Sequence, residues 1–438
     1  MLKHLLVACG VLSFACGDPA SADAPEGWDG QKLLALVDAD MAATGYADGK
    51  LYPIADTSDQ LMVIDMATGA AAPLDRPVSN TVMGWPGSLA IGAEARFAYA
   101  VTSRSGVSRS IEEMADGVFT EFPIDTTLTT IDVETAHVVS ETSVCRKPMS
   151  VDVAPGGDWL LVACGDKDGE LTIVPLKGGV PGAPRSIDLD VPAFAERDVD
   201  AGATYGVVHP SGQAAAVVLN NRAVALVRLD LDETGTPTAG HAEAPTPTDR
   251  WLSVARWTQT GDHLLVADTG WGPSPLDAVF NANGDIVSFA LSPSDDVRGI
   301  VSVAEVSKSP EAFELNRAGD LLVAVNMERT YLPNGFPGAL FRHRNAASLS
   351  LVEVDARSGA LKTLGEPVKF RGVLPEDAVF DADGDHIAAI VYQDHGKPRS
   401  DGWVTFFRIE GRGDARRIIE TGERIALPRG GHDLVPID

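Results

Sequence analysis

The sequence predicts an all-β fold, a seven-bladed β-propeller closed by pairing of its C-terminal strand with an N-terminal hairpin. Three observations lead to this prediction. A unit of about 55 residues recurs along the chain, as expected for a repeat fold. Each unit consists of short apolar runs of strand length separated by turn residues. Helical segments of about ten or more residues between those runs, which a parallel α/β fold requires, are almost absent.

The repeating unit is clearest near the C-terminus. Residues 375–384, PEDAVFDADG, lead into the apolar run 387–391, and a loop then leads into the run 403–407. The Asp-Gly turn is typical of a connection between antiparallel strands, and the small aliphatic run after it predicts a strand buried on both faces. Five further copies of the turn segment and the strand after it are residues 86–95 with 97–101, 147–157 with 160–164, 203–212 with 215–219, 252–261 with 264–267, and 310–319 with 321–325.

The seventh unit is divided between the two ends of the chain. Residues 431–438, GHDLVPID, are similar to 375–381 and stop where the turn should follow. Residues 47–49 supply that turn, 51–55 the second strand and 61–65 the third. Pairing of residues 434–437 with 51–55 closes the ring and leaves no long free sheet edge. This interpretation gives an N-terminal tether at residues 23–46 and a propeller at residues 47–438.

The N-terminus, residues 1–22, has the pattern of an export signal. Lys3 and His4 precede an apolar stretch, residues 5–15, that is too short to span a bilayer. Two cleavage sites compete: a lipoprotein signal would end before Cys16 and leave that cysteine lipidated, whereas ordinary cleavage would leave residue 23 first. Either version predicts a protein of the periplasm or cell envelope, with membrane contact only through an N-terminal lipid anchor.

Composition limits the partners. The chain has 438 residues, 62 of them acidic and 35 basic, and its net charge of −27 argues against binding to nucleic acid or to anionic lipid. A monomer that binds a small molecule or an envelope protein is expected. Beyond the signal, the cysteines are Cys145 and Cys164, which in an oxidising compartment either form a disulfide or serve as two small buried hydrophobes.

The loops between second and third strands point to a functional face. They are long at residues 103–127, 268–283, 326–347 and 392–402, and all of these would lie on one side of the ring. Loops held on a rigid scaffold commonly carry binding residues. Aromatic side chains in these loops either stack on a ligand ring or pack their own loops; they are Trp271, Tyr331, Phe336 and Tyr392.

The same alignment predicts which side chains meet at the channel mouth, where the inner strands begin. Residues assigned there are Tyr205, Glu311, Glu376, Asp377, His432 and Asp433, with Arg329, Arg342, Arg344 and Arg371 as basic candidates from nearby loops. Crowded carboxylates require a cation, a basic partner or raised pKa values. Glu311, Glu376 and Asp433 are candidate ligands for a divalent cation such as calcium. The alternative is a solvated, salt-bridged rim.

Two segments carry a family resemblance. Val208-His209-Pro210-Ser211-Gly212 and the strand Leu321-Leu322-Val323-Ala324-Val325-Asn326 resemble scaffold segments of YVTN-repeat and lactonase-like (phosphogluconolactonase-like) propellers, and the resemblance extends over residues 47–438. It implies the seven-bladed fold. The lactonase pattern is not kept at the channel mouth, because Thr204 and Tyr205 stand where Arg-His is typical, and Glu311 where a basic residue is common.

Two functions follow. The sequence favours a propeller that binds a small molecule, metal or protein partner on its loop-rich face. The alternative is a lactonase-like hydrolase that uses the rim carboxylates, with or without a metal, to activate water.

Overall fold

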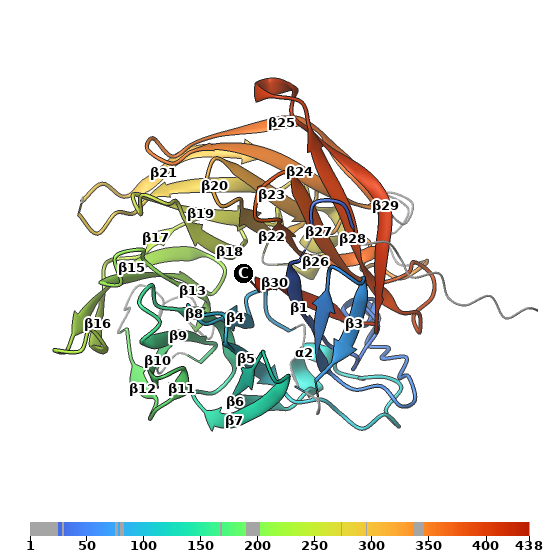
Figure 1. The fold of residues 1–438 in the computed structure, drawn as a ribbon, viewed down its shortest axis with the longest axis horizontal. Coiled ribbons are helices and arrows are strands. Elements are labelled where there is room, and N and C mark those ends of the chain that lie inside the picture. The colour runs from blue at the N-terminus through green and yellow to red at the C-terminus, as the bar shows by residue number, and fades with distance from the viewer. Residues whose placement is uncertain are drawn as a thin grey trace, which may run out of the picture.

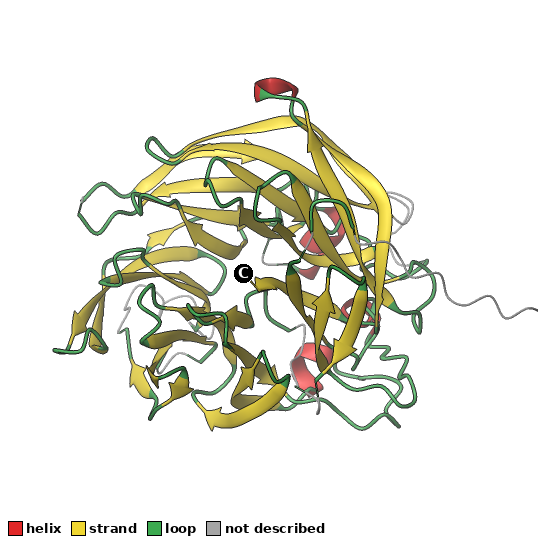
Figure 2. Ribbon diagram, viewed as in Figure 1, coloured by secondary structure: helices red, strands yellow, loops and turns green. Residues whose placement is uncertain are grey.

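The computed structural model describes residues 25–28, 30–74, 78, 83–166, 169–189, 202–272, 274–294, 296–335 and 346–437. Within these residues the strands form seven antiparallel sheets arranged around a central axis, which confirms the predicted seven-bladed propeller (Figure 1). Strands make up nearly all of the ring, and the helices are few and short (Figure 2). The predicted signal segment and Cys16 lie outside the described residues.

We number the blades along the chain and give each from its innermost strand outward. Blade 1 consists of β4 (Leu89–Ile91), β5 (Phe97–Arg104), β6 (Ile124–Asp132) and β7 (His137–Ser143). Blade 2 consists of β8 (Pro148–Val153), β9 (Trp159–Cys164), β10 (Leu171–Lys177), and the short outer strands β11 (Val180–Pro181) and β12 (Arg185–Ile187). Blade 3 consists of β13 (Ala203–Val208), β14 (Ala214–Leu219), β15 (Ala223–Leu231), and the outer strands β16 (Pro237–Ala242) and β17 (Thr246–Pro247).

Blades 4 to 6 each have four strands. Blade 4 consists of β18 (Leu252–Trp257), β19 (His263–Asp268), β20 (Asp285–Ala290) and β21 (Gly299–Glu305). Blade 5 consists of β22 (Pro310–Leu315), β23 (Leu321–Asn326), β24 (Ala346–Asp355) and β25 (Ala360–Arg371). Blade 6 consists of β26 (Val373–Phe380), β27 (His386–Gln393), β28 (Gly402–Glu410) and β29 (Arg417–Leu427).

Blade 7 joins the two ends of the chain. It consists of β30 (Gly431–Ile437), β1 (Lys32–Val37), β2 (Gln60–Asp65) and β3 (Ala70–Pro73). The C-terminal strand is innermost, as predicted, and lies at the centre of the ring in Figure 1.

The partner of the C-terminal strand differs from the prediction. β30 pairs with β1, with Ala35 opposite Leu434, and not with residues 51–55. Residues 32–37, KLLALV, place five of their six side chains in the core, as a second strand requires. Pro53 interrupts residues 51–55 and cannot donate a ladder hydrogen bond. The propeller therefore already includes Lys32, inside the stretch predicted as a tether, and residues 47–49 form the end of helix α1 (Gly45–Asp48) and its left-handed cap Gly49.

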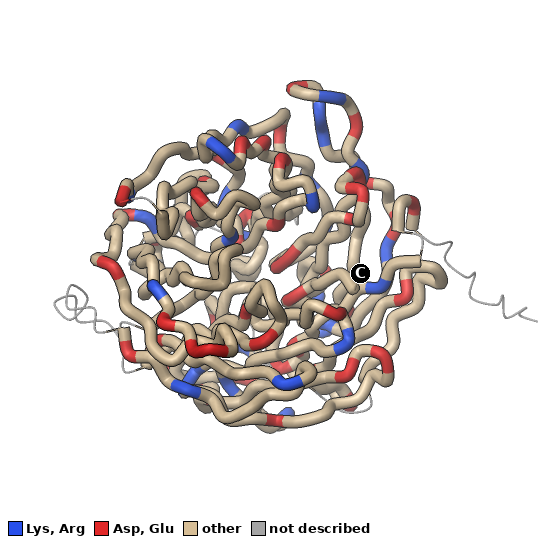
Figure 3. The backbone as a smooth tube through the Cα atoms, turned by 60° about the vertical axis from the view of Figure 1, so that its left-hand side comes forward, with Lys and Arg blue, Asp and Glu red and all other residues tan. Residues whose placement is uncertain are grey.

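Burial falls from the inner strands to the outer ones. The second strands β9, β14, β19 and β23 are buried at every position, in agreement with their aliphatic sequences. The outer strand β7 alternates between exposed and half-buried residues because only one of its faces packs on a neighbour. Acidic residues occur all round the ring and are not gathered in one blade (Figure 3).

The long loops pack together on one face of the ring, which we call the loop face. Met41, Val118, Val279, Met327 and Tyr392 belong to one buried cluster, although they come from separate connections along the chain. Helices α2 (Val118–Glu121) and α4 (Pro275–Phe280) lie in two of these loops, and a further helical turn, η2 (Gly413–Ala415), lies between β28 and β29. None of the helices in the described ranges is long and apolar enough to cross a membrane.

Cys145 and Cys164 form a disulfide, with a Cα–Cα distance of 6.2 Å. In the ladder, Cys164 lies opposite Pro148. The chain before Pro148 turns back through Lys147, whose φ is 54°, and this turn brings Cys145 within reach of Cys164.

Candidate functional site

A cavity of about 620 Å³, which we call the loop-side cavity, opens among the loops at the end of the channel. Side chains from every part of the ring line it. The apolar lining residues are Tyr46, Ala47, Met83, Trp85, Phe119, Met149, Trp251, Trp271, Ala278, Val279, Met327, Tyr331, Leu332 and Leu374. The polar side chains in the lining are Lys147, Thr204, Asn220, Asn221, Ser274, Glu311 and Glu376. Such a space suits a small molecule with an apolar body.

Inner strands form the floor of this cavity. In each blade the repeat alignment places two consecutive residues at the start of the inner strand. Met149, Thr204, Glu311 and Glu376 are the first of these two residues in their blades, and all four line the cavity. Tyr205, Asp377 and Asp433, each the second of the two residues in its blade, line a separate cavity of about 540 Å³, the opposite cavity. Successive residues of a strand point to opposite sides, so neighbours in sequence reach different cavities.

The predicted cluster is therefore divided. Glu311 and Glu376 meet in the loop-side cavity with Trp271 and Tyr331. Asp433 and Asp377 belong to the opposite cavity. His432 lies fully buried between them, with Nδ1 3.6 Å from Glu376 Oε2 and Nε2 3.9 Å from Asp433 Oδ2. The structure thus does not gather Glu311, Glu376 and Asp433 around one cation.

Three of the floor residues follow the same backbone feature, a residue with positive φ followed by a proline. Ser309 and Leu374 have φ values of 53° and 50°, and each is followed by a proline and then by a glutamate of the floor. Lys147, Pro148 and Met149 repeat this arrangement in blade 2. Positive φ is unusual for residues other than glycine, so this lead-in is a specific local structure.

Burial dominates the electrostatics of the two glutamates. Desolvation, followed by the neighbouring charge of Glu376, raises the pKa of Glu311 well above its ordinary range. Desolvation also raises the pKa of Glu376, and a hydrogen bond from Glu311 partly offsets this effect. This environment therefore favours the protonated form of Glu311, whose hydroxyl would donate to Glu376. Oε2 of Glu311 is buried and has no hydrogen-bond partner.

Aromatic rings form much of the wall. Trp271 lies between Trp85 and Tyr331, with ring centroids 6.0 Å and 5.8 Å away. The indole N–H of Trp271 donates to Ser309 Oγ (2.9 Å), and the hydroxyl of Tyr331 donates to the carbonyl of Ala278 (2.7 Å). Because their polar atoms are engaged within the protein, these side chains offer ring surface to a ligand.

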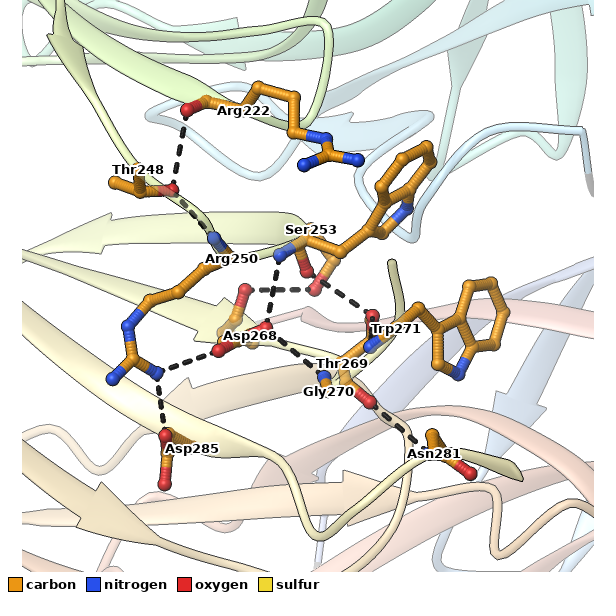
Figure 4. Close-up of polar contacts among 12 residues, drawn as sticks. Arg222, Thr248, Arg250, Ser253, Asp268, Thr269, Gly270, Trp271, Asn281 and Asp285 are labelled. Carbon is orange, nitrogen blue, oxygen red and sulfur yellow. Dashed lines mark hydrogen bonds and ion pairs between the residues drawn. The ribbon is translucent and has the colours of Figure 1, made fainter. Parts of the chain in front are cut away.

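Asp268, at the end of β19, organises two of these rings (Figure 4). Its Oδ1 accepts hydrogen bonds from the backbone N–H groups of Trp251 (3.1 Å) and Gly270 (3.0 Å). Its Oδ2 accepts one from Arg250 (2.6 Å), which also pairs with Asp285. One carboxylate thereby holds the backbone at Trp251, just before β18, and the backbone at Gly270, just after β19 and next to Trp271.

Carboxylates of the opposite cavity serve mainly as links between blades. Asp152 accepts a hydrogen bond from the N–H of Val208 (2.7 Å), and Asp377 accepts one from the N–H of Leu434 (3.1 Å). Burial, then the charge of Asp433, raises the pKa of Asp377 to about 8. The cations here are Arg317 and Arg256, of which Arg256 pairs with Glu314 at 3.0 Å. It also donates to the hydroxyl of Tyr205.

The remaining candidates lie elsewhere. Arg329 donates to Oδ1 of Asn281 (2.6 Å) and to its carbonyl oxygen, and Arg371 pairs with Asp394 (2.7 Å), so neither neutralises the glutamates. The hydroxyl of Tyr392 donates to the carbonyl of Met41 (2.6 Å), and this ring packs loops together. Arg342, Arg344 and Phe336 are outside the described residues.

Three other carboxylates do lie close together. The ligand atoms of Asp38, Asp40 and Asp59 are within 4.8 Å of one another, in the segment after β1. Arg109 pairs with Asp40 at 2.9 Å, so the charge of this cluster is partly balanced from within the protein.

The alignment missed several wall residues. Trp85, Lys147, Gly202, Trp251 and Leu374 each stand two positions before the first aligned position of their blade, and all five line the cavity. Extending the repeat comparison by two residues would have found them. Tyr46 and Phe119, whose ring centroids are 5.5 Å apart, lie in the short helices α1 and α2, outside the repeats and without such a signal.

Comparisons agree with this architecture. No protein-family model matches the sequence, and neither does any curated protein. A "putative 6-phosphogluconolactonase" from Bacteroides fragilis has 14% identity and a TM-score of 0.59, with 94% of this chain and 100% of that chain covered. Another from Bacteroides uniformis has 14% identity and a TM-score of 0.57, with 92% and 99% covered. A protein from Lactobacillus plantarum has 12% identity and a TM-score of 0.58, with 93% and 99% covered.

The chain has the fold of a lactonase-like propeller. Sequence identity this low supports a statement about fold alone, so the function must be argued from the cavity.

Proposed function

We propose that this chain is an exported binding protein whose loop-side cavity holds a small molecule built on an apolar or aromatic ring. One observation carries the proposal: the cavity of about 620 Å³ is lined by ring surfaces from several blades above two buried carboxyl groups. Aromatic walls give affinity through contact area, and a few polar groups at one end fix the orientation of the ligand.

The experiment is a binding screen on the mature chain. Tryptophan fluorescence and thermal shift would be followed against a panel of ring compounds, because a ligand that binds only the folded state stabilises it. Trp271→Leu should weaken binding by about tenfold or more. Trp257→Phe is the matched control, since Trp257 lines the opposite cavity. Equal losses in both variants would reject the loop-side cavity as the binding site.

A lactonase-like hydrolase is the second candidate, and the carboxyl pair favours it. A protonated Glu311 next to Glu376 is the type of arrangement that supports general acid–base catalysis. A phosphorylated substrate fits less well, because Lys147 is the one Lys or Arg among the described lining residues. Hydrolysis of unphosphorylated lactones by the wild type, lost in Glu311→Gln and in Glu376→Gln, would establish this function in place of simple binding.

Export is part of the proposal, either with lipid anchoring at Cys16 or with ordinary cleavage before residue 23. The apolar stretch 5–15 supports export, and the disulfide between Cys145 and Cys164 is typical of an oxidising compartment. Mass spectrometry of the protein from its native host should show a mature chain that begins at residue 16 with added acyl mass, or at residue 23 without it. An intact residue 1 would overturn both versions.

A further inference from the structure

We infer that the ligand of the loop-side cavity is an organic cation, whose charged head is held by Glu311, Glu376 and the surrounding ring surfaces. This inference rests on the proposed function and specifies its ligand class. It is carried by three features of the described residues: the floor, the wall and the distribution of basic side chains.

The floor contains a buried carboxyl oxygen without a donor. Glu311 and Glu376 are 6% and 2% exposed, and Oε2 of Glu311 has no hydrogen-bond partner. Both ring nitrogens of His432, directly beside Glu376, also lack one. An unsatisfied buried acceptor costs about 1–3 kcal/mol, so a ligand that places positive charge or an N–H group here removes a penalty present in the empty protein.

The wall favours the same sign of charge. The face of an aromatic ring carries negative electrostatic potential, and a cation binds over it more strongly when the cation is shielded from water. Trp85, Trp271 and Tyr331 form a series of neighbouring rings. The indole N–H of Trp271 and the hydroxyl of Tyr331 are hydrogen-bonded within the protein. Tyr46 lies near both glutamates, which together with burial raise the pKa of its phenol well above 10.0 and keep it neutral.

None of the Lys or Arg side chains that the structure describes is paired with these two glutamates. Lys147 lines the cavity from the start of blade 2, whereas the glutamates belong to blades 5 and 6, across the ring. Arg329 is bound to Asn281, and Arg256 pairs with Glu314 in the opposite cavity. Among the described residues, Glu311 and His432 therefore lie beside Glu376 in the place where a counter-ion is expected.

The test uses pairs of compounds that have the same shape and differ in charge. (3-Hydroxyphenyl)trimethylammonium is compared with 3-tert-butylphenol, and benzyltrimethylammonium with neopentylbenzene; in each second compound a carbon atom replaces the charged nitrogen. Dissociation constants are measured by calorimetry and by tryptophan fluorescence at two salt concentrations. We expect the cation of each pair to bind at least about tenfold more tightly, which corresponds to about 1.4 kcal/mol.

Variants separate the cavity from the acidic surface. The double variant Glu311→Gln/Glu376→Gln should remove the preference for the cation. Trp271→Leu, which keeps both glutamates, should weaken binding of the cation. Circular dichroism and melting curves check that each variant is folded. Equal binding within the pairs, or a cation preference that survives in both folded variants, overturns the inference.

The outcomes distinguish this inference from the proposed function. If neutral ring compounds bind in the cavity and the cations do not, the cation inference fails and the binding function stands. If no compound of either kind changes the fluorescence or the melting temperature of the wild type, both fail.

Discussion

Asp433, on the last strand of the chain, accepts hydrogen bonds from the backbone N–H groups of Gly87 (2.6 Å) and Ser88 (2.9 Å) at the entrance to blade 1. The hydroxyl of Ser88 donates to the same carboxylate at 2.5 Å. The side chain predicted as a metal ligand thus joins blade 7 to blade 1, next to the point where the two ends of the chain close the ring.

Removal of this link should destabilise the whole propeller. Asp433→Ala leaves two buried N–H groups and a hydroxyl without their acceptor, and the free energy of unfolding should fall by about 2–4 kcal/mol. Urea denaturation followed by circular dichroism measures the change. Asp414→Ala is the control, because that side chain is 76% exposed. A loss no larger than in the control would show that the link contributes little.

The buried carboxyl groups predict stability that falls as the pH rises. Burial raises the pKa of Glu311 and Glu376 well above 4.5 and that of Asp377 to about 8, whereas in the unfolded chain these groups titrate in their ordinary range. Between the two ranges the folded state binds more protons than the unfolded state. The stabilisation from these groups is therefore complete at acidic pH and is lost as the pH rises through the raised values.

Glu311→Gln tests this sign. The amide has the shape of the protonated acid and can still donate to Glu376, so the variant should gain stability relative to the wild type as the pH rises from the ordinary range of glutamate to the raised pKa of Glu311. Melting temperatures across that range should diverge by a few degrees. Glu134→Gln, at an exposed position, should give a curve parallel to the wild type. A parallel curve for Glu311→Gln as well would contradict the assignment.

Asp268 is predicted to position the tryptophans of the wall. In Asp268→Ala, the N–H groups of Trp251 and Gly270 lose their shared acceptor, and tryptophan emission should shift to longer wavelength as the rings become more mobile and hydrated. Binding of any ligand found in the screen should weaken with it. Asp285→Ala removes only the second partner of Arg250 and should leave emission and binding close to the wild type. The prediction fails if the two variants behave alike.

The disulfide is predicted to stabilise blade 2. Cys145 and Cys164 are 19 residues apart, and closing a loop of that length contributes about 3 kcal/mol to the free energy of unfolding. The Cys145→Ser/Cys164→Ser variant should unfold at a correspondingly lower denaturant concentration. Addition of a reductant should lower the stability of the wild type but not of the variant. Equal sensitivity of both proteins would argue against the bond in solution.

The sequence by itself determined the architecture. The alternation of Asp-Gly turns with fully apolar runs such as 321–325 predicts antiparallel blades, because these patterns depend only on local conformation and on burial. Alignment of the repeats also predicted that Glu311 and Glu376 would meet, since equivalent positions of adjacent blades are neighbours in a closed ring. The prediction that residues 51–55 pair with the C-terminal strand was wrong. It assumed that a turn like those of the other blades joins the inner strand to the second strand, but in blade 7 these two strands come from opposite ends of the chain, and the second strand is β1.

Only the tertiary structure decided which face each side chain reaches. The alignment places Glu376 and Asp377 together at one channel mouth, but they line different cavities, because side chains alternate along a strand and the register is set by pairing with β27. The aromatic wall depended on how loops from separate blades pack, and the roles of Asp433 and Asp268 depended on backbone N–H groups. Every residue except proline carries a backbone N–H group, so the sequence does not show which of these groups will point at a given carboxylate.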